Sequence, residues 1–131
     1  MSRFLVYATA LFFLVYGAIF VAFPMEMAHW VTGASLNGNS TSAIIDFRAT
    51  YGGAQLAIGV VLLLVMKLRA DVDLALLIVA ASLLLMALGR VIGIVVDTQP
   101  NTLMLLYLFA ELVFGGLALW QRKQVTIQAP S

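Results

Sequence analysis

Four long apolar runs constrain what this chain can fold into more than any other feature. They cover residues 4–23, 44–66, 74–96 and 103–120. A helix of about 20 apolar residues spans a hydrocarbon core of about 30 Å. Of the 131 residues, 63% are hydrophobic, more than a soluble domain of this size can hide in one core. We therefore predict an all-α, integral membrane four-helix bundle that forms a single transmembrane domain over residues 1–131.

The basic residues indicate how this bundle is oriented. The loops between the runs are short, so that successive spans are expected to be antiparallel. The basic residues outside the spans are Arg3, Lys67, Arg69, Arg122 and Lys123. All of them fall on one side of the membrane, and the two loops on the other side contain no Lys or Arg. Because basic loops stay on the cytoplasmic side, we predict that both termini are cytoplasmic.

The first run also resembles a secretory signal peptide. It is longer than the usual apolar region of about 7–15 residues in such peptides, and no A-x-A cleavage site follows it. We therefore expect an uncleaved first span. One face of this span carries Thr9, Phe13, Tyr16, Phe20 and Phe23. Such a stripe is more typical of helix packing than of a ligand-binding surface.

A short interfacial helix is predicted in the first outer loop. Pro24 suits the first position of a helix, Glu26 suits its first turn, and Gly33 is placed to end it. Trp30 fits the headgroup level of a membrane. His29 is either a pH-sensitive or substrate-facing group or, as we expect, an ordinary interfacial side chain.

Composition excludes several classes of function. The net charge of +1 gives no broad basic surface for a nucleic-acid partner. The chain has no Cys and one His, which excludes a thiolate metal site and a multi-histidine metal or haem site within one chain. We therefore expect neither a metal nor a cofactor, and the surrounding partners are expected to be membrane lipids.

The second run opens on an unusual polar stretch, residues 46–59. At about 100° per residue, one narrow arc of a helix holds Arg48, Gly52, Gln55 and Gly59, with Tyr51 beside it. Lipid does not favour a polar face of small residues, so this face is expected to point at other helices or at a cavity.

Glycines within the spans are expected at helix contacts, where small residues let two backbones approach closely. The glycines concerned are Gly52, Gly59, Gly93 and Gly115. Their spread over three spans predicts that small residues set the distances between the helices.

Three of the predicted spans each carry an ionisable residue at a similar depth. At 1.5 Å per residue, Arg48, Arg90 and Glu111 lie roughly 6–12 Å below the outer boundary of the membrane. A charge inside the bilayer costs at least about 2.5–3.5 kcal/mol on insertion scales. We therefore predict that the three side chains form one layer.

This layer allows two interpretations. In the structural one, Glu111 bridges Arg48 and Arg90 and fixes the register of the helices. In the other, two Arg against one Glu leave a positive site that accepts an anionic group of an amphiphilic molecule. The candidate ligand-binding residues are Arg48, Tyr51, Gln55, Arg90, Tyr107 and Glu111.

Three functions are compatible with the layer. The first is a non-enzymatic membrane protein that binds a lipid-like ligand. The second is an enzyme on a lipid-like substrate, with Glu111 as acid/base and Tyr51 or Tyr107 as proton relay. The third is an accessory subunit of a larger membrane complex, or a homo-oligomer. The polar residues occupy one layer only, which disfavours a channel.

Three short motifs carry a resemblance to a known family. They are residues 47–53 (FRATYGG), Gly89-Arg90 followed by Gly93, and Glu111-Leu112 followed by Gly115. In these motifs, and over nearly the whole chain to Trp120, the sequence resembles a family of small bacterial membrane proteins catalogued as domain of unknown function 4345. The resemblance implies a four-helix fold in the bacterial inner membrane and assigns no function.

Cysteine-accessibility labelling checks the predicted topology, because the chain has no Cys of its own. Asn37→Cys is expected to react with an impermeant maleimide added outside the cell. Gln128→Cys is expected to react only after the membrane is permeabilised. Labelling of the first variant from the cytoplasmic side alone would contradict the predicted orientation.

Overall fold

The fold is all-helical in the part of the chain that the structure describes. This computed structural model describes residues 1–33, 41–97 and 100–128, and no strand occurs within these ranges. The elements are α1 (Ser2–Ala22), α2 (Pro24–Thr32), α3 (Thr41–Phe47), the π-helix η1 (Arg48–Gly53), α4 (Ala54–Leu68), α5 (Val72–Asp97) and α6 (Thr102–Gln128).

Four helical segments of the described chain are long and apolar enough to cross a membrane. They are Ser2–Ala22, Ser42–Leu68, Val72–Val96 and Thr102–Thr126. The second of these runs through α3, η1 and α4. The predicted all-α architecture with four long apolar helices is therefore confirmed, whereas the cytoplasmic position of the termini stays a prediction.

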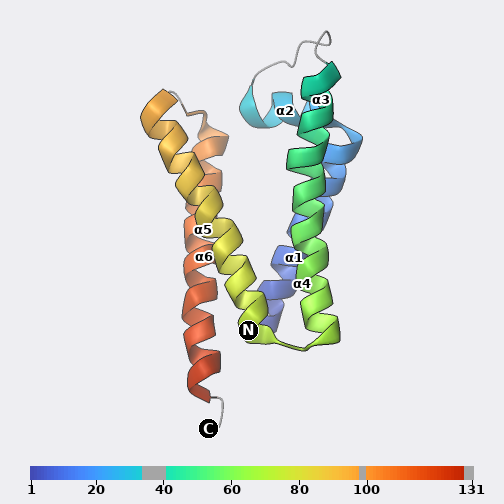
Figure 1. Ribbon diagram of the computed structural model, residues 1–131. Coiled ribbons are helices and arrows are strands. Elements are labelled where there is room, and N and C mark those ends of the chain that lie inside the picture. Colours follow the sequence, from blue (N-terminus) through green and yellow to red (C-terminus); the bar gives the residue numbers. More distant parts are fainter. Residues whose placement is uncertain (34–40, 98–99, 129–131) are drawn as a thin grey trace.

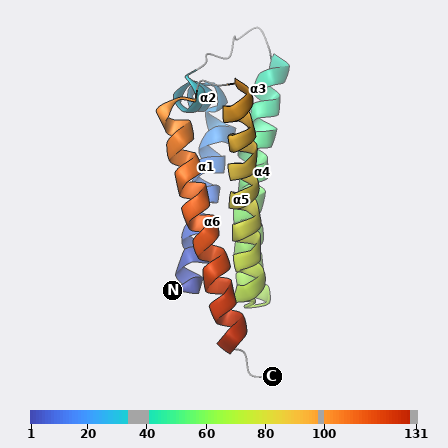
Figure 2. The same ribbon diagram turned by 90° about the vertical axis from the view of Figure 1, so that its left-hand side faces the viewer.

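The four long helices form two antiparallel pairs, one of α1 with η1 and α4 and the other of α5 with α6. The pairs lie apart at the end near α2 and α3 and approach each other at the end that carries both termini (Figure 1). A view turned by 90° shows that the axes of the four long helices are roughly aligned with one another (Figure 2). The space between the pairs therefore narrows toward the termini.

The hydrophobic core fills the narrow end of the bundle. Its fully buried large side chains there are Val6, Phe13, Leu62, Leu76 and Val79. They come from α1, α4 and α5, and Ala118 adds a contact from α6. In a bilayer, close van der Waals packing of such side chains drives the association of helices, so this end holds the two pairs together.

An ion pair at the same end joins the start of α5 to the last turns of α6. Arg122 donates from Nε and Nη2 to the two carboxylate oxygens of Asp73, at 2.9 and 3.2 Å. The hydroxyl of Thr126 reaches the same carboxylate at 3.4 Å. These contacts with α5 stabilise the polar last turns of α6. The helix therefore continues past Trp120, the predicted end of the span.

Glycines bring α1 and α4 into close contact. A Cβ atom built on Gly59 would lie 2.7 Å from Cγ of Leu14 and 2.9 Å from the carbonyl oxygen of Ala10. A Cβ on Gly17 would lie 2.8 Å from the carbonyl oxygen of Gly52. These positions accept no side chain, and the expected contacts of Gly52 and Gly59 are confirmed.

Within the second pair, Gly115 of α6 has the same role against α5. A Cβ on it would lie 2.8 Å from two side-chain carbons of Leu84, so its expected contact is also confirmed. Gly93 is half-buried, and its contact stays a prediction. By contrast, a Cβ on Gly116 meets nothing within 4 Å.

The short helix predicted in the first outer loop is present as α2. Pro24 occupies its first turn, and Gly33 ends it in the left-handed conformation with a φ of 75°. The N–H of Gly33 donates to the carbonyl oxygen of His29 at 2.8 Å. His29 and Trp30 are exposed, as expected of interfacial side chains.

Asn101 links this short helix to α6. Its side-chain nitrogen donates to the carbonyl oxygen of Val31 at 2.9 Å, and its side-chain oxygen accepts the N–H of Met104 at 2.9 Å. The second bond caps the first turn of α6. One side chain thus starts α6 and holds α2 beside it at the wide end of the bundle.

Substitution of single glycines by alanine tests the close packing of α1 against α4. Gly59→Ala is expected to lower stability by about 1–3 kcal/mol, because a methyl group meets the backbone of α1. Gly116→Ala is the matched control, since it also removes a glycine from a helix but meets open space. Thermal unfolding of both variants in one detergent provides the comparison. Equal midpoints would show that α1 and α4 do not pack in this way.

Candidate functional site

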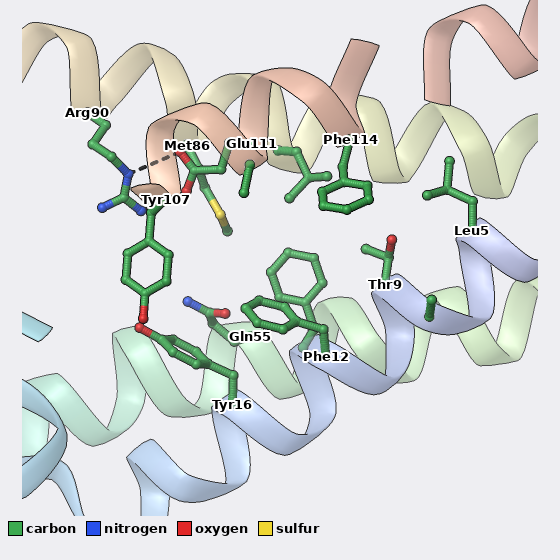
Figure 3. A pocket seen from close by; sticks show the side chains of 14 residues that line it. Leu5, Thr9, Phe12, Tyr16, Gln55, Met86, Arg90, Tyr107, Glu111 and Phe114 are labelled. Carbon is green, nitrogen blue, oxygen red and sulfur yellow. Dashed lines mark hydrogen bonds and ion pairs between the residues drawn. The ribbon is translucent and has the colours of Figure 1, made fainter. Parts of the chain in front are cut away.

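A cavity of about 270 Å³ lies between the two helix pairs. It is bounded by α1 on one side and by α5 and α6 on the other, and Gln55 reaches it from α4 (Figure 3). Polar groups gather at one end, where Tyr16, Gln55, Arg90, Tyr107 and Glu111 meet. Apart from the hydroxyl group of Thr9, the rest of the wall is aliphatic and aromatic, so the cavity has one polar end and one largely apolar end.

The polar end is organised by an ion pair between α5 and α6. Arg90 donates from Nη2 to Oε1 of Glu111 at 2.7 Å and from Nε to Oε2 at 3.0 Å. The side chain of Glu111 is 9% exposed and that of Arg90 is 23% exposed. Two parallel bonds of this kind are the strong, directional form of an Arg–carboxylate contact. The pair therefore fixes both side chains and has no net charge.

Two neighbours on α6 hold the guanidinium group of Arg90 from other sides. Nη1 donates to the sulfur atom of Met104 at 3.1 Å. The carbon atom of the group lies 5.3 Å from the centre of the Tyr107 ring, within the range of a cation–π contact. A sulfur atom and a ring face are weaker partners than an oxygen atom. The guanidinium group of Arg90 can therefore still bind an oxygen acceptor.

Arg90 keeps unused donors in this arrangement. A guanidinium group has five N–H donors, and three of them bind Glu111 and Met104. Within the described residues the other two have no hydrogen-bond partner. The side-chain amide of Gln55, which also lines the cavity, has none there either. In hydrocarbon each such group costs several kcal/mol.

Tyr16 and Tyr107 close the cavity across its polar end. Their hydroxyl groups point toward each other from α1 and α6 (Figure 3), and their ring centres lie 6.3 Å apart. Tyr16 also stacks on Phe12 at 5.4 Å. The two tyrosines therefore connect the helix pairs at the level of the ion pair.

The apolar end of the cavity reaches the molecular surface. Phe12 of α1 is 51% exposed and Phe114 of α6 is 48% exposed, although both line the cavity. Ala8 of α1 lines it as well and is exposed. The cavity thus opens between α1 and α6, on a surface that faces lipid if the four helices cross a membrane.

Arg48 and Tyr51 lie outside the cavity, so that the predicted three-residue layer is wrong. Glu111 pairs with Arg90 alone, and Arg48 donates from Nη1 to the carbonyl oxygen of Val21. Tyr51 stacks between Phe20 and Phe47. The charge at the site is balanced, and the predicted positive charge is absent.

The end of α1 explains why Arg48 is drawn away. Pro24 has no N–H, and α2 begins with it, so the last carbonyls of α1 lose their partners along the chain. A guanidinium group at the negative end of the α1 dipole satisfies the carbonyl of Val21. Arg48 therefore serves as a cap for α1.

The π-helix η1 interrupts the second span, yet most of the predicted arc is kept. In this segment the N–H of Ala54 donates to the carbonyl oxygen of Ala49, five residues back. The wider turn changes the angular position of all later residues. Arg48, Gly52 and Gly59 nonetheless all face α1, while Gln55 faces the cavity.

The sequence did not identify Tyr16, Phe12, Phe114 and Met104 as site residues. Tyr16 and Thr9 belong to the stripe on the first span that was interpreted as packing, and both line the cavity together with Phe13. The polar members of this stripe, Thr9 and Tyr16, were the available signal, because pure lipid or core contact does not call for hydroxyl groups. Nothing in the sequence pattern singled out Met104.

In the part of the chain that the structure describes, this is a small all-helical protein. Its four long apolar helices are consistent with an integral membrane protein. The chain belongs to the family described as Domain of unknown function (DUF4345), whose family model matches residues 1–121. This confirms the resemblance noted in the sequence. Neither the curated proteins nor the solved structures that were searched gave a match.

A double-mutant cycle tests the Arg90–Glu111 pair. Glu111→Gln and Arg90→Met are each expected to lower stability by about 3–5 kcal/mol, because each leaves a charge without its partner. The combination of Arg90→Met with Glu111→Gln is expected to recover most of this loss, since no charge remains. Unfolding in detergent measures all four proteins. Additive losses would show that the two side chains do not interact.

Proposed function

We propose that this protein binds an amphiphilic, lipid-like molecule in the cavity between its helix pairs. The observation that carries the proposal is the shape of the cavity, which has an ion pair with unused donors at one end and an exposed apolar mouth at the other. Such a molecule would place its polar head at Arg90 and its apolar chain along α1 toward the mouth between Phe12 and Phe114.

The unused polar groups support a ligand over a mere packing defect. An apolar void costs only the contacts that its walls lose. Here the wall also holds free N–H groups of Arg90 and the amide of Gln55, which need partners in a bilayer. The volume is close to the lower end of the roughly 300–1,000 Å³ that small-molecule sites occupy.

The length of the cavity supports an elongated molecule. Along α1 its lining extends from Leu5 to Tyr16. At 1.5 Å per residue this is about 16 Å, roughly half of a hydrocarbon core of about 30 Å. A single acyl or prenyl chain fits such a slot, and its lateral mouth allows entry from one leaflet.

Catalysis by Glu111 finds less support in this geometry. Both of its carboxylate oxygens accept N–H groups of Arg90. A general base must instead lie within hydrogen-bond reach of the proton that it removes. The ion pair is therefore better suited to hold a head group than to transfer a proton.

Filling the cavity tests the proposal. Ala110→Phe places a ring inside the cavity, because Ala110 is part of its lining. Ala57→Phe is the matched control, since Ala57 lies exposed on α4 and away from the cavity. The purified proteins are incubated with a bacterial lipid extract, freed of excess lipid, and extracted for mass spectrometry. Wild type and Ala57→Phe are expected to retain a single-chain lipid, and Ala110→Phe is expected to lose it.

Two results would contradict lipid binding in this cavity. One is equal retention of the same lipid by all three proteins, which would place the binding site elsewhere. The other is no retained lipid in the wild type. Thermal unfolding of Ala110→Phe provides the check that a loss of lipid is not a loss of fold.

A further inference from the structure

We infer that the head group bound at Arg90 is uncharged and accepts hydrogen bonds, as the carbonyl group of a fatty ester or of a prenyl quinone does. The inference rests on the proposed function and names the chemical class of its ligand. It departs from the anionic head group that the sequence predicts, because the structure removes Arg48 from the site.

The charge balance of the site argues against an anion. Among the residues that line the cavity, Arg90 and Glu111 are the charged ones, and they neutralise each other. An anionic head group would add an unbalanced negative charge beside the carboxylate of Glu111, inside hydrocarbon. An unpaired charge in hydrocarbon is unfavourable. An uncharged head group avoids this cost.

The hydrogen-bonding groups argue for an acceptor. Arg90 offers two unused N–H donors and no acceptor. Gln55 adds an amide with two donors and one acceptor. Both oxygens of Glu111 already accept from Arg90. The two unused N–H groups of Arg90 can each donate to a carbonyl oxygen of a bound molecule, whereas an alkane chain offers them no acceptor.

Two sources share this chemistry. A fatty ester presents one carbonyl group on a flexible chain, and a prenyl quinone presents carbonyl groups on a flat ring. The rings of Phe12, Tyr16 and Tyr107 beside the polar end provide faces for either one. The experiment therefore includes one probe of each kind.

Methionine methyl groups report binding at the site itself. Met86 lines the cavity and Met104 contacts Arg90, whereas Met1 and Met25 are exposed and lie away from the site. The full chain with ¹³C-methyl methionine, in detergent at pH 9, is titrated with methyl dodecanoate, dodecanoate, dodecane and a decyl benzoquinone. We expect the signals of Met86 and Met104 to shift with the ester or the quinone, at concentrations at least roughly tenfold below those needed for dodecanoate or dodecane.

A charge substitution is expected to reverse this preference. Glu111→Gln leaves Arg90 without its carboxylate, and dodecanoate can supply the missing one. In this variant dodecanoate is expected to bind more tightly than the ester and to raise the unfolding temperature, which it does not do for the wild type. Glu26→Gln is the matched control, because Glu26 is exposed on α2, and it is expected to keep the preference of the wild type.

The outcomes separate the inference from the proposed function. If no probe shifts Met86 or Met104 in the wild type, the proposed binding function fails. If dodecanoate binds the wild type as tightly as the ester and the quinone, binding stands and the inference of an uncharged head group is overturned. A preference for the ester supports an acyl source, and a preference for the quinone supports a prenyl source. The wild-type series decides the question even if Glu111→Gln folds poorly.

Discussion

In hydrocarbon there is no water to bind a polar group, so each one inside the bundle needs a partner within the protein. Pro24 ends α1 and leaves carbonyl groups open, and Arg48, the first residue of η1, donates to the carbonyl of Val21. On the other helix pair, Arg90 and Glu111 neutralise each other. Arg48 and Arg90 thus each have a local structural role, and of these two arginines Arg90 is the one that keeps unused donors at the cavity.

Most of the fold could be predicted because the apolar runs carry the signal directly. The lengths of these runs predicted the four long helices, and the positions of Pro24 and Gly33 predicted α2. The contacts of Gly52, Gly59 and Gly115 followed from the size of glycine. The extension of α6 past Trp120 was not predicted, because it depends on the contact of Arg122 with Asp73 from a distant part of the chain.

The site was predicted only in part. Arg90, Glu111, Tyr107 and Gln55 meet at the cavity, as expected of polar residues at one depth on neighbouring helices. Arg48 lies outside the cavity because it donates to the carbonyl of Val21 at the end of α1, and Tyr51 because it stacks between Phe20 and Phe47. Depth can be counted along a sequence, but the direction of a side chain depends on every turn before it.

Unequal packing explains where the cavity lies. Small residues such as Gly17 and Gly59 draw the helices of the first pair together, and Gly115 does so in the second. Between the pairs, by contrast, the bulky rings of Phe12, Tyr16 and Phe114 line the cavity. Phe12 and Phe114 are the exposed rings among these and form the mouth, so the proposed ligand would enter from the bilayer. Under the proposed function, selection among such molecules would fall to the polar end, where the balanced ion pair would favour a head group that brings no charge.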